Sequence, residues 1–499
     1  MKYSSTRGRE RLLVSAEAII AGIADDGGLF VPLHIPVLEQ TVIAGLSGLG
    51  YRQRAAKILN EFLTDYSIDD LDDCIARAYH VEKFDHKDVA PLKILPDDHY
   101  VLELWHGPTS AFKDMALQLL PQLMSRALHM TGESAEIVIL VATSGDTGKA
   151  ALEGFKDVEQ IKIIVFYPHL GVSEIQRRQM VTQSGENVAV IAVKGNFDDA
   201  QTGVKNVFHH EQYNRELAEQ GFQLSSANSI NWGRLVPQIV YYFSAYADLV
   251  REGQITPGNP VNFVVPTGNF GNILAGYYAK QMGLPVKRLI CASNANNVLT
   301  DFLRTGVYDR NRSFHKTISP SMDILISSNL ERLLYHITEG NTEQVSAWMT
   351  ELNTEGRYDI GAKNLAAVQE LFWAGWADDD AAMHTIKAVY EQFGYTVDPH
   401  TAVAWDVGSQ YRRQTGDTTP NIILSTASPY KFNESVLKAL KGAEGLAGKD
   451  EFAMLEELAE LSRIEVPQAL AGLKNAAERF MQVCEKTELE QVIKSLLVK

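Results

Sequence analysis

One lysine of this sequence, Lys113, has neighbours that could make its side-chain amine reactive. Lys113 directly follows Ala111 and Phe112 in the segment ELWHGPTSAFKDMALQ (103–118), where the pattern indicates the start of a helix. Burial beside apolar side chains and the positive end of a helix would both lower the pKa of this amine. A lysine that forms a Schiff base with a carbonyl compound needs an amine with such a lowered pKa. The alternative is an ordinary solvated lysine on a surface turn.

Three further segments have the composition of anion-binding loops. Each follows a predicted strand, where open α/β sheets bind their ligands: ATSGDTGKAAL (142–152), PTGNFGNILAGYYAK (266–280) and STASPYKF (425–432). The best phosphate cradle is GNFGN (268–272), because Gly268 and Gly271 allow a close backbone approach and can take a positive φ. A helix predicted from about Ile273 would present its positive end to the anion. A purely structural turn is the alternative.

Other site motifs are not matched. SGDTGK (144–149) has two residues between its glycines and Ala150 after the lysine, whereas a Walker loop needs four residues and then Ser or Thr. No GxGxxG spacing occurs in either loop, and no GxSxG elbow is present. The 13 histidines are scattered, and the three cysteines lie far apart. We therefore expect no metal site and no disulfide framework.

The composition favours a globular protein with small-molecule ligands. The chain has 499 residues, 45% of them hydrophobic, and a net charge of −16. That charge argues against nucleic acid or an anionic membrane as the main partner. No apolar run approaches the ~18 residues of a membrane span. The N-terminal segment (1–20) lacks the pattern of a signal peptide, so we expect a cytoplasmic protein. The oligomeric state is left open.

The chain alternates between strand-like and helical segments from about residue 100. The strand-like runs are 137–142, 161–167, 188–193, 261–266, 288–293 and 421–426. This alternation predicts an α/β fold with mostly parallel sheets covered by helices. The intervals 1–90, 325–400 and the region after about 435 look mostly helical, and 83–98 looks like a connector. We predict three regions: a small N-terminal domain (1–95), a catalytic α/β core of two subdomains (96–435) and a helical C-terminal region (436–499).

The motif HGPTSAFKD (106–114) resembles the cofactor-lysine motif of threonine synthases, which belong to the fold type II (tryptophan-synthase-β-like) pyridoxal-phosphate enzymes. Further motifs occur in the order that this family uses: GLFVP (28–32), ATSGDTG (142–148), SANSIN (226–231) followed by Arg234, PTGNFGN (266–272) and STASPYKF (425–432). The likeness runs from about residue 25 to residue 432. It implies the fold type II architecture and pyridoxal 5'-phosphate as the cofactor.

The resemblance also implies a role for each matching residue. Lys113 would bind the cofactor as a Schiff base, and Thr426 would face the pyridine nitrogen as a neutral partner. The other implied cofactor-binding residues are Phe112, Asp146, Gly268, Asn269, Phe270, Gly271 and Asn272. The implied substrate-binding residues are Ser144, Gly145 and Thr147 for a carboxylate, and Asn228, Ser229 and Arg234 for a phosphate, with Thr147 shared between them. Many fold type II relatives have Asn where this chain has Asp146. Two anionic oxygens would repel there unless a proton is shared, so the contact of Asp146 stays open.

The implied reaction converts O-phospho-L-homoserine and water to L-threonine and phosphate. Lys113 would serve alternately as base and acid. One alternative is a related lyase that eliminates phosphate and releases a keto acid. Another is a non-catalytic binding protein that retains the fold.

Overall fold

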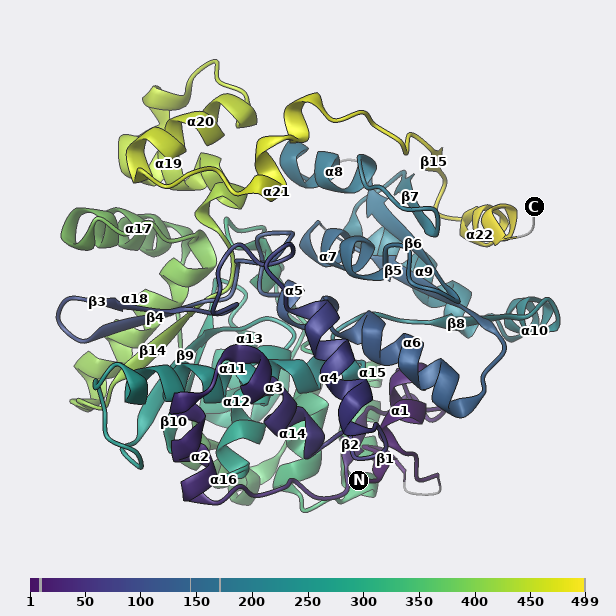
Figure 1. Ribbon diagram of the computed structural model, residues 1–499, viewed down its shortest axis with the longest axis horizontal. Helices are drawn as coiled ribbons and strands as arrows, with labels where there is room; N and C mark the ends of the chain where they lie inside the picture. Colours follow the sequence, from purple (N-terminus) through teal and green to yellow (C-terminus); the bar gives the residue numbers. More distant parts are fainter. Residues whose placement is uncertain (9–10, 144, 170–171, 498–499) are drawn as a thin grey trace.

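Two mainly parallel β-sheets form the framework of the protein (Figure 1). The computed structural model describes residues 1–8, 11–143, 145–169 and 172–497. The six-stranded sheet has the order β13-β10-β9-β14-β4-β3, with strands β3 (Leu92–Leu95), β4 (His99–Glu103), β9 (Val261–Pro266), β10 (Val286–Ser293), β13 (Phe372–Trp376) and β14 (Asn421–Ser425). The five-stranded sheet has the order β15-β7-β6-β5-β8, with strands β5 (Glu136–Ala142), β6 (Ile161–Pro168), β7 (Val188–Val193), β8 (Phe222–Ser225) and β15 (Val483–Cys484). All pairings in these two sheets are parallel except β3 with β4.

Helices surround both sheets, and two short antiparallel ribbons complete the fold. The ribbons pair β1 (Tyr3–Ser5) with β2 (Phe30–Pro32) and β11 (Val307–Asp309) with β12 (Arg357–Asp359). The α-helices of the first half are α1 (Ser15–Ala21), α2 (Gln40–Gly45), α3 (Tyr51–Asn60), α4 (Ile68–Ala78), α5 (Asp114–Leu117), α6 (Leu120–Thr131), α7 (Asp146–Phe155), α8 (Glu174–Val181), α9 (Phe197–His209), α10 (Glu211–Glu219) and α11 (Trp232–Arg251). Those of the second half are α12 (Gly271–Gln281), α13 (Val298–Thr305), α14 (Leu330–Ile337), α15 (Thr342–Thr354), α16 (Gly361–Leu371), α17 (Asp379–Phe393), α18 (Pro399–Thr415), α19 (Asn433–Lys441), α20 (Glu451–Ser462), α21 (Gln468–Ala471) and α22 (Leu489–Leu497).

The central strands of the six-stranded sheet are buried on both faces, since successive side chains point to opposite sides. Val264, Ile290 and Ile423 belong to an apolar cluster that includes residues of α17 and α18. The alternate residues Phe263 and Leu289 belong to the main core, which includes residues of α11 and α12. This two-sided burial explains why the strands read as continuous apolar runs in the sequence. The predicted class, parallel sheets covered by helices, is confirmed.

Several strands lie where we expected none. β3 falls in the predicted connector, and β4 begins directly after it. β13 interrupts the interval 325–400, and β15 lies in the predicted helical C-terminal region. β3, β13 and β15 are edge strands, and β15 has only two residues, so a long β-branched run was not required to form them. The helical character predicted for residues 1–90 is confirmed by α1 to α4.

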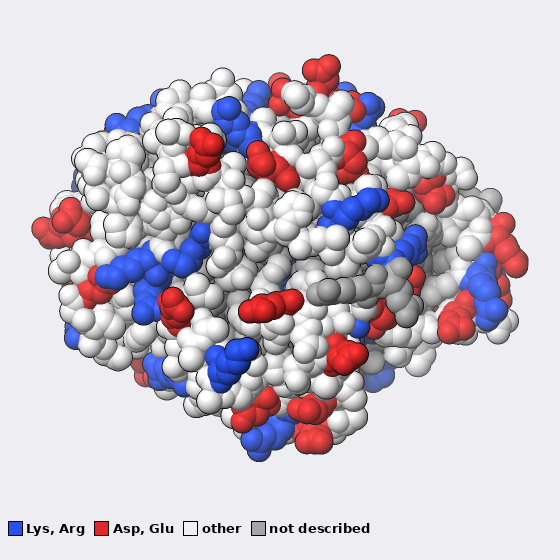
Figure 2. All heavy atoms as spheres, turned by 90° about the horizontal axis from the view of Figure 1, so that it is seen from below, with Lys and Arg blue, Asp and Glu red and all other residues white. Residues whose placement is uncertain are grey.

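Acidic and basic side chains are interspersed over the face that Figure 2 shows, without a large area of one sign. The net negative charge is therefore not concentrated there. Among the described residues, no helix is long and apolar enough to cross a membrane.

Candidate active site

Lys113 lies in the loop that joins β4 to α5, and the neighbouring strand β14 supplies the loop beside it. Lys113 is the N-cap residue of α5, which confirms the predicted helix start. The backbone N–H of Phe112 donates to the carbonyl oxygen of Thr426 (2.8 Å), and Ser428 N–H donates to Ser110 O (3.0 Å). Because β4 and β14 are parallel neighbours, their carboxyl ends bring these two loops together.

The Lys113 amine is buried among polar partners. The residue is 8% exposed, and its Nζ lies 3.6 Å from Asp146 Oδ2 and donates to Ser321 Oγ at 3.2 Å. Burial lowers the pKa of Lys113; Asp146 partly opposes this effect, while Lys431 and Arg234 add to it. A lowered pKa leaves more of the amine in its nucleophilic form. The predicted desolvated lysine is therefore present.

Asp146 begins α7 and meets a second buried lysine. Lys431 Nζ lies 2.6 Å from Asp146 Oδ1, and Gln176 donates to the same oxygen at 3.0 Å. Burial alone would raise the pKa of Asp146, but Lys431 and Lys113 hold this pKa far below its usual range. Lys431 was not foreseen, although a lysine inside a small-residue loop after a buried strand is a usable signal. A fully buried lysine needs such an anionic partner.

The glycine loop joins β9 to α12, but the positive φ that we expected at Gly268 and Gly271 is found at neither glycine. Phe270 takes a left-handed conformation (φ 60°), and α12 begins at Gly271, two residues earlier than expected. Asn272 accepts hydrogen bonds from the Tyr241 and Tyr242 hydroxyls at Oδ1 (2.6 and 2.9 Å). Its buried Nδ2 has no partner among the described residues. The first N–H groups of a helix lack intrahelical partners, so this end of α12 fits a phosphate group.

Arg234 occupies the first turn of α11 and is 5% exposed. Its Nη1 donates to Ala227 O (2.9 Å), and Arg234 makes no ion pair with a carboxylate within the described chain. Burial lowers the pKa of Arg234 to about 10. The preceding loop approaches the glycine loop through Ser328, whose Oγ lies 3.5 Å from Ser229 Oγ and 3.5 Å from Asn269 Oδ1. A buried cation without an acidic partner is suited to an anionic ligand.

The segment SPSMDILISSNLER (319–332) was missed by sequence reasoning, although it packs against several predicted residues. The carbonyl oxygen of Ser321 approaches Gly268 so closely that a Cβ at this glycine would lie 2.5 Å from it. Ser327 Oγ donates to Gly268 O at 2.8 Å. His400 Nε2 accepts the N–H of Ser321 at 3.1 Å, which fixes Ser321 beside the lysine. The four serines of this segment were the available signal.

Two predicted substrate residues, Gly145 and Thr147, lie at the start of α7. Gly145 has a φ of 143°, and a Cβ there would collide with the Gln176 side chain, so glycine is required. Thr147 is half-buried, and Ser144 lies outside the described residues. Within the described part, neither Thr147 nor Asn228 makes a side-chain hydrogen bond to another predicted residue.

His106 fixes the start of the lysine loop. Its Nδ1 lies 2.5 Å from Asp85 Oδ1, and its Nε2 lies 2.9 Å from Glu103 Oε2. Burial lowers the pKa of His106, but the hydrogen bonds to Asp85 and Glu103 outweigh it and raise the pKa to about 9. The protonated ring thus links the end of β4 to the preceding segment.

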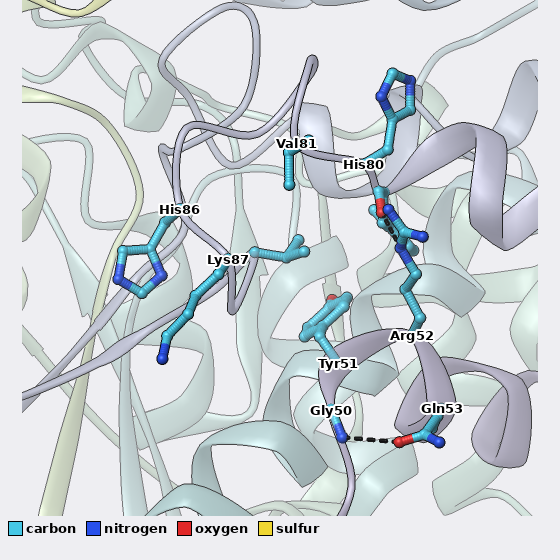
Figure 3. Close-up of a pocket in the computed structure, with 10 residues that line it drawn as sticks. Gly50, Tyr51, Arg52, Gln53, His80, Val81, His86 and Lys87 are labelled. Carbon is cyan, nitrogen blue, oxygen red and sulfur yellow. Dashed lines mark hydrogen bonds between the residues drawn. The ribbon is translucent and has the colours of Figure 1, made fainter.

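A surface pocket of about 290 Å³ lies elsewhere, between the start of α3 and the segment 79–89 (Figure 3). It contains none of the predicted site residues. Two hydrogen bonds join residues that line it: Arg52 donates to Tyr79 O, and Gly50 N–H donates to the Gln53 side chain. The chemistry of Lys113 therefore does not belong to this pocket.

Comparison with known proteins identifies the family. Residues 92–380 match the family "Pyridoxal-phosphate dependent enzyme", while residues 2–79 and 401–495 match "Threonine synthase N terminus" and "Threonine synthase, C-terminal". The threonine synthase of Pseudomonas aeruginosa is 42% identical over 444 residues, covering 88% of this chain and 90% of its own length. The chain belongs to the threonine synthase family. Membership indicates pyridoxal phosphate as the cofactor.

Two other threonine synthase relatives define the extent of the similarity. A crystal structure of PLP-bound threonine synthase from Brucella melitensis has 37% identity and a TM-score of 0.88, with all of both chains covered. Human "Threonine synthase-like 1" is 42% identical over 436 residues, covering 85% of this chain. The matched part is 58% of the length of that human relative.

The buried polar residues around Lys113 fit the phosphorylated cofactor that membership of the threonine synthase family indicates. Lys431 and Arg234 are buried cations, and the Lys113 amine adds a third positive charge when it is protonated; the buried carboxyl groups of Asp146 and Asp114 oppose them. The unpartnered Nδ2 of Asn272 marks the helix end where a phosphate would add acceptors. Arg234, which pairs with no carboxylate in the described chain, supplies the local cation that anion binding requires in a protein of net charge −16.

Proposed function

We propose that the protein converts O-phospho-L-homoserine and water to L-threonine and phosphate. The observation that carries this proposal is the buried amine of Lys113 together with two groups suited to bind anions, the start of α12 and the buried guanidinium of Arg234. A phosphorylated substrate that reacts on a phosphorylated cofactor requires both sites. The names of the relatives that the chain covers almost fully support the same reaction.

Residues at the ends of several strands would hold pyridoxal phosphate in this proposal. Lys113 would bond it covalently, the N–H groups of residues 268–272 would bind its phosphate, and Phe112 would pack near its ring. Asp146 would face its phenolic oxygen, and Thr426 would face its pyridine nitrogen. When bound, the cofactor makes the Cα proton of an attached amino acid acidic and acts as an electron sink. The neutral hydroxyl of Thr426 keeps that sink weaker than a carboxylate partner would.

Lys113 carries the proton transfers. Its amine would take the proton from the substrate Cα, and loss of a further proton from Cβ would allow the γ-phosphate to leave from Cγ. Cγ then gains a proton, the hydroxyl of a water molecule adds at Cβ with release of the other water proton, and Lys113 returns a proton to Cα. Burial lowers the pKa of Lys113, and a base near the working pH is the most effective one. The hydroxyl of Ser321, 3.2 Å from Nζ, orients the amine between these steps.

Substrate recognition is divided between two loops. Arg234, Asn228 and Ser229 bind the substrate phosphate, and the planar fork of an arginine can meet two phosphate oxygens. The substrate carboxylate is bound at the start of α7 by Ser144, Gly145 and Thr147, with Thr147 also near the phosphate.

The decisive experiment is incubation of the purified protein with O-phosphohomoserine, measuring threonine, phosphate and keto acid together. We expect equal amounts of threonine and phosphate. Phosphate with keto acid instead of threonine would identify the related lyase. A colourless protein, without visible absorbance that borohydride bleaches, would contradict cofactor binding.

A further inference from the structure

Asp146 lies between two lysines that come from different loops. Its Oδ2 faces Lys113 Nζ at 3.6 Å, and its Oδ1 faces Lys431 Nζ at 2.6 Å. The Lys431 side chain has no exposed surface, and the Asp146 side chain is 5% exposed. Water therefore does little to stabilise the charges of this cluster, and each ionised group is stabilised mainly by its neighbours.

The two lysines have different tasks in the proposed function. The Lys113 amine is consumed when it bonds to the cofactor, and it is released again when a substrate amine replaces it. Its charge beside Asp146 therefore changes during the reaction. Lys431 makes no such exchange, since its other contact is a hydrogen bond to the Thr109 carbonyl oxygen (3.0 Å). An unpaired buried carboxylate would cost several kcal/mol or take up a proton.

We propose that Lys431 is a positioning residue that supplies Asp146 with a constant counter-charge, so that an ionised carboxylate can stay beside the cofactor at every stage. The proposal rests on the proposed function, because it assumes that Lys113 bonds to pyridoxal phosphate. It also explains how Asp can occupy this position. The negative charge of Asp146 is neutralised by Lys431, so it does not repel an anionic oxygen of the cofactor as a lone carboxylate would.

The other groups around Asp146 cannot supply that charge. Gln176 is neutral and donates one hydrogen bond to Oδ1. Arg234 acts on Lys113 through space, but its guanidinium donates to Ala227 O and makes no hydrogen bond or ion pair with Asp146 in the described chain. Asp114 is a second buried carboxyl group near Lys431, and burial raises its pKa to about 6 while Thr109 donates to it twice. Lys431 is thus the permanent cation in contact with Asp146.

The test uses the holoenzyme variants Lys431→Met and Asp146→Asn, and the double variant with both changes. The readouts are the pH midpoint of the visible cofactor band and the affinity for pyridoxal phosphate by spectroscopic titration. In Lys431→Met the uncompensated carboxylate should retain the proton on the nitrogen that links Lys113 to the cofactor. The midpoint should then rise by about one pH unit or more. In Asp146→Asn the uncompensated lysine should lower it.

The double variant decides between a charge role and a merely structural one. Both charges are then absent, so the midpoint and the cofactor affinity should return toward those of the wild type. If Lys431→Met does not fold, the double variant should still fold and bind cofactor. Shifts of the two single variants in the same direction, or a double variant as impaired as the sum of both, would overturn the proposal. A wild-type protein without any visible band would instead refute the proposed function.

Discussion

Replacing Arg234 with Met removes a buried charge while keeping a side chain of similar length. Burial lowers the pKa of Arg234 from its ordinary 12.5 to about 10, which corresponds to about 3 kcal/mol of destabilisation of the charged form. A phosphate that binds at Arg234 meets a guanidinium that is already desolvated. We therefore expect the substitution to lower kcat/KM for O-phosphohomoserine about 10²–10⁴-fold, as for a loss of about 3–5 kcal/mol.

The same arithmetic predicts the opposite effect on stability. Because the charged Arg234 has no acidic partner in the described chain, Met should leave the Tm of the ligand-free protein unchanged or raise it. Cofactor affinity should hardly change, since the glycine loop at α12 binds a different phosphate. Lys at this position should recover part of the activity, because it is a cation without the planar fork.

The assay combines steady-state kinetics, cofactor titration and thermal unfolding. A matched control is Arg251→Met at the other end of α11, where the side chain is 40% exposed and pairs with Asp248. This control should leave kcat/KM unchanged. The reasoning is refuted if Arg234→Met keeps near-normal kcat/KM, loses cofactor and substrate affinity equally, or lowers the Tm strongly.

Three further predictions concern the lysine, the glycines and pH. Lys113→Ala should abolish turnover and the visible cofactor absorbance. The fold should stay intact, because Asp146 keeps its ion pair with Lys431. Normal turnover would contradict this prediction. Gly271→Ala should weaken cofactor binding about tenfold or more without lowering the Tm, because its Cβ would make only ordinary contacts of 3.4 Å or more. Gly268→Ala should lower the Tm, since its Cβ would lie 2.5 Å from a backbone oxygen. Equal losses of Tm in the two variants would be inconsistent with this difference. His106, whose pKa is raised to about 9 from 6.5, should contribute up to about 3 kcal/mol to the free energy of unfolding. That contribution is complete below pH 6.5 and lost as the pH rises through 9, so the stability difference between wild type and His106→Gln should shrink between pH 6 and pH 9.5.

Much of the fold could be predicted because buried parallel strands leave a strong apolar signal. The runs at 137–142 and 261–266 are confirmed as β5 and β9, and the helix start at Lys113 is confirmed. β13 could not be found in the same way. An edge strand is covered on fewer sides, so its five residues FWAGW carry no long β-branched run. The predicted domain boundaries near residues 95 and 435 stay predictions.

The parts of the candidate site that consist of short, contiguous sequence motifs could be predicted. The loops around Lys113, Gly268 and Arg234 are contiguous motifs, and the structure brings them together, while their functional roles stay predictions. Lys431 and Ser321 could not be placed from sequence, since their contacts join residues more than 200 positions apart. Such contacts follow from the order of strands in the sheet, which no local pattern encodes.

The pairing of β15 with β7 has a consequence for how the chain is made. β15 adds Val483 and Cys484 to a sheet whose other strands all lie between residues 136 and 225. During synthesis, the edge of β7 therefore stays unpaired until more than 250 further residues have left the ribosome. Unpaired strand edges are templates for aggregation. Loss of the last segment, from about residue 480, should leave that edge exposed and promote aggregation in the cell, even though the segment lies far in sequence from every predicted site residue.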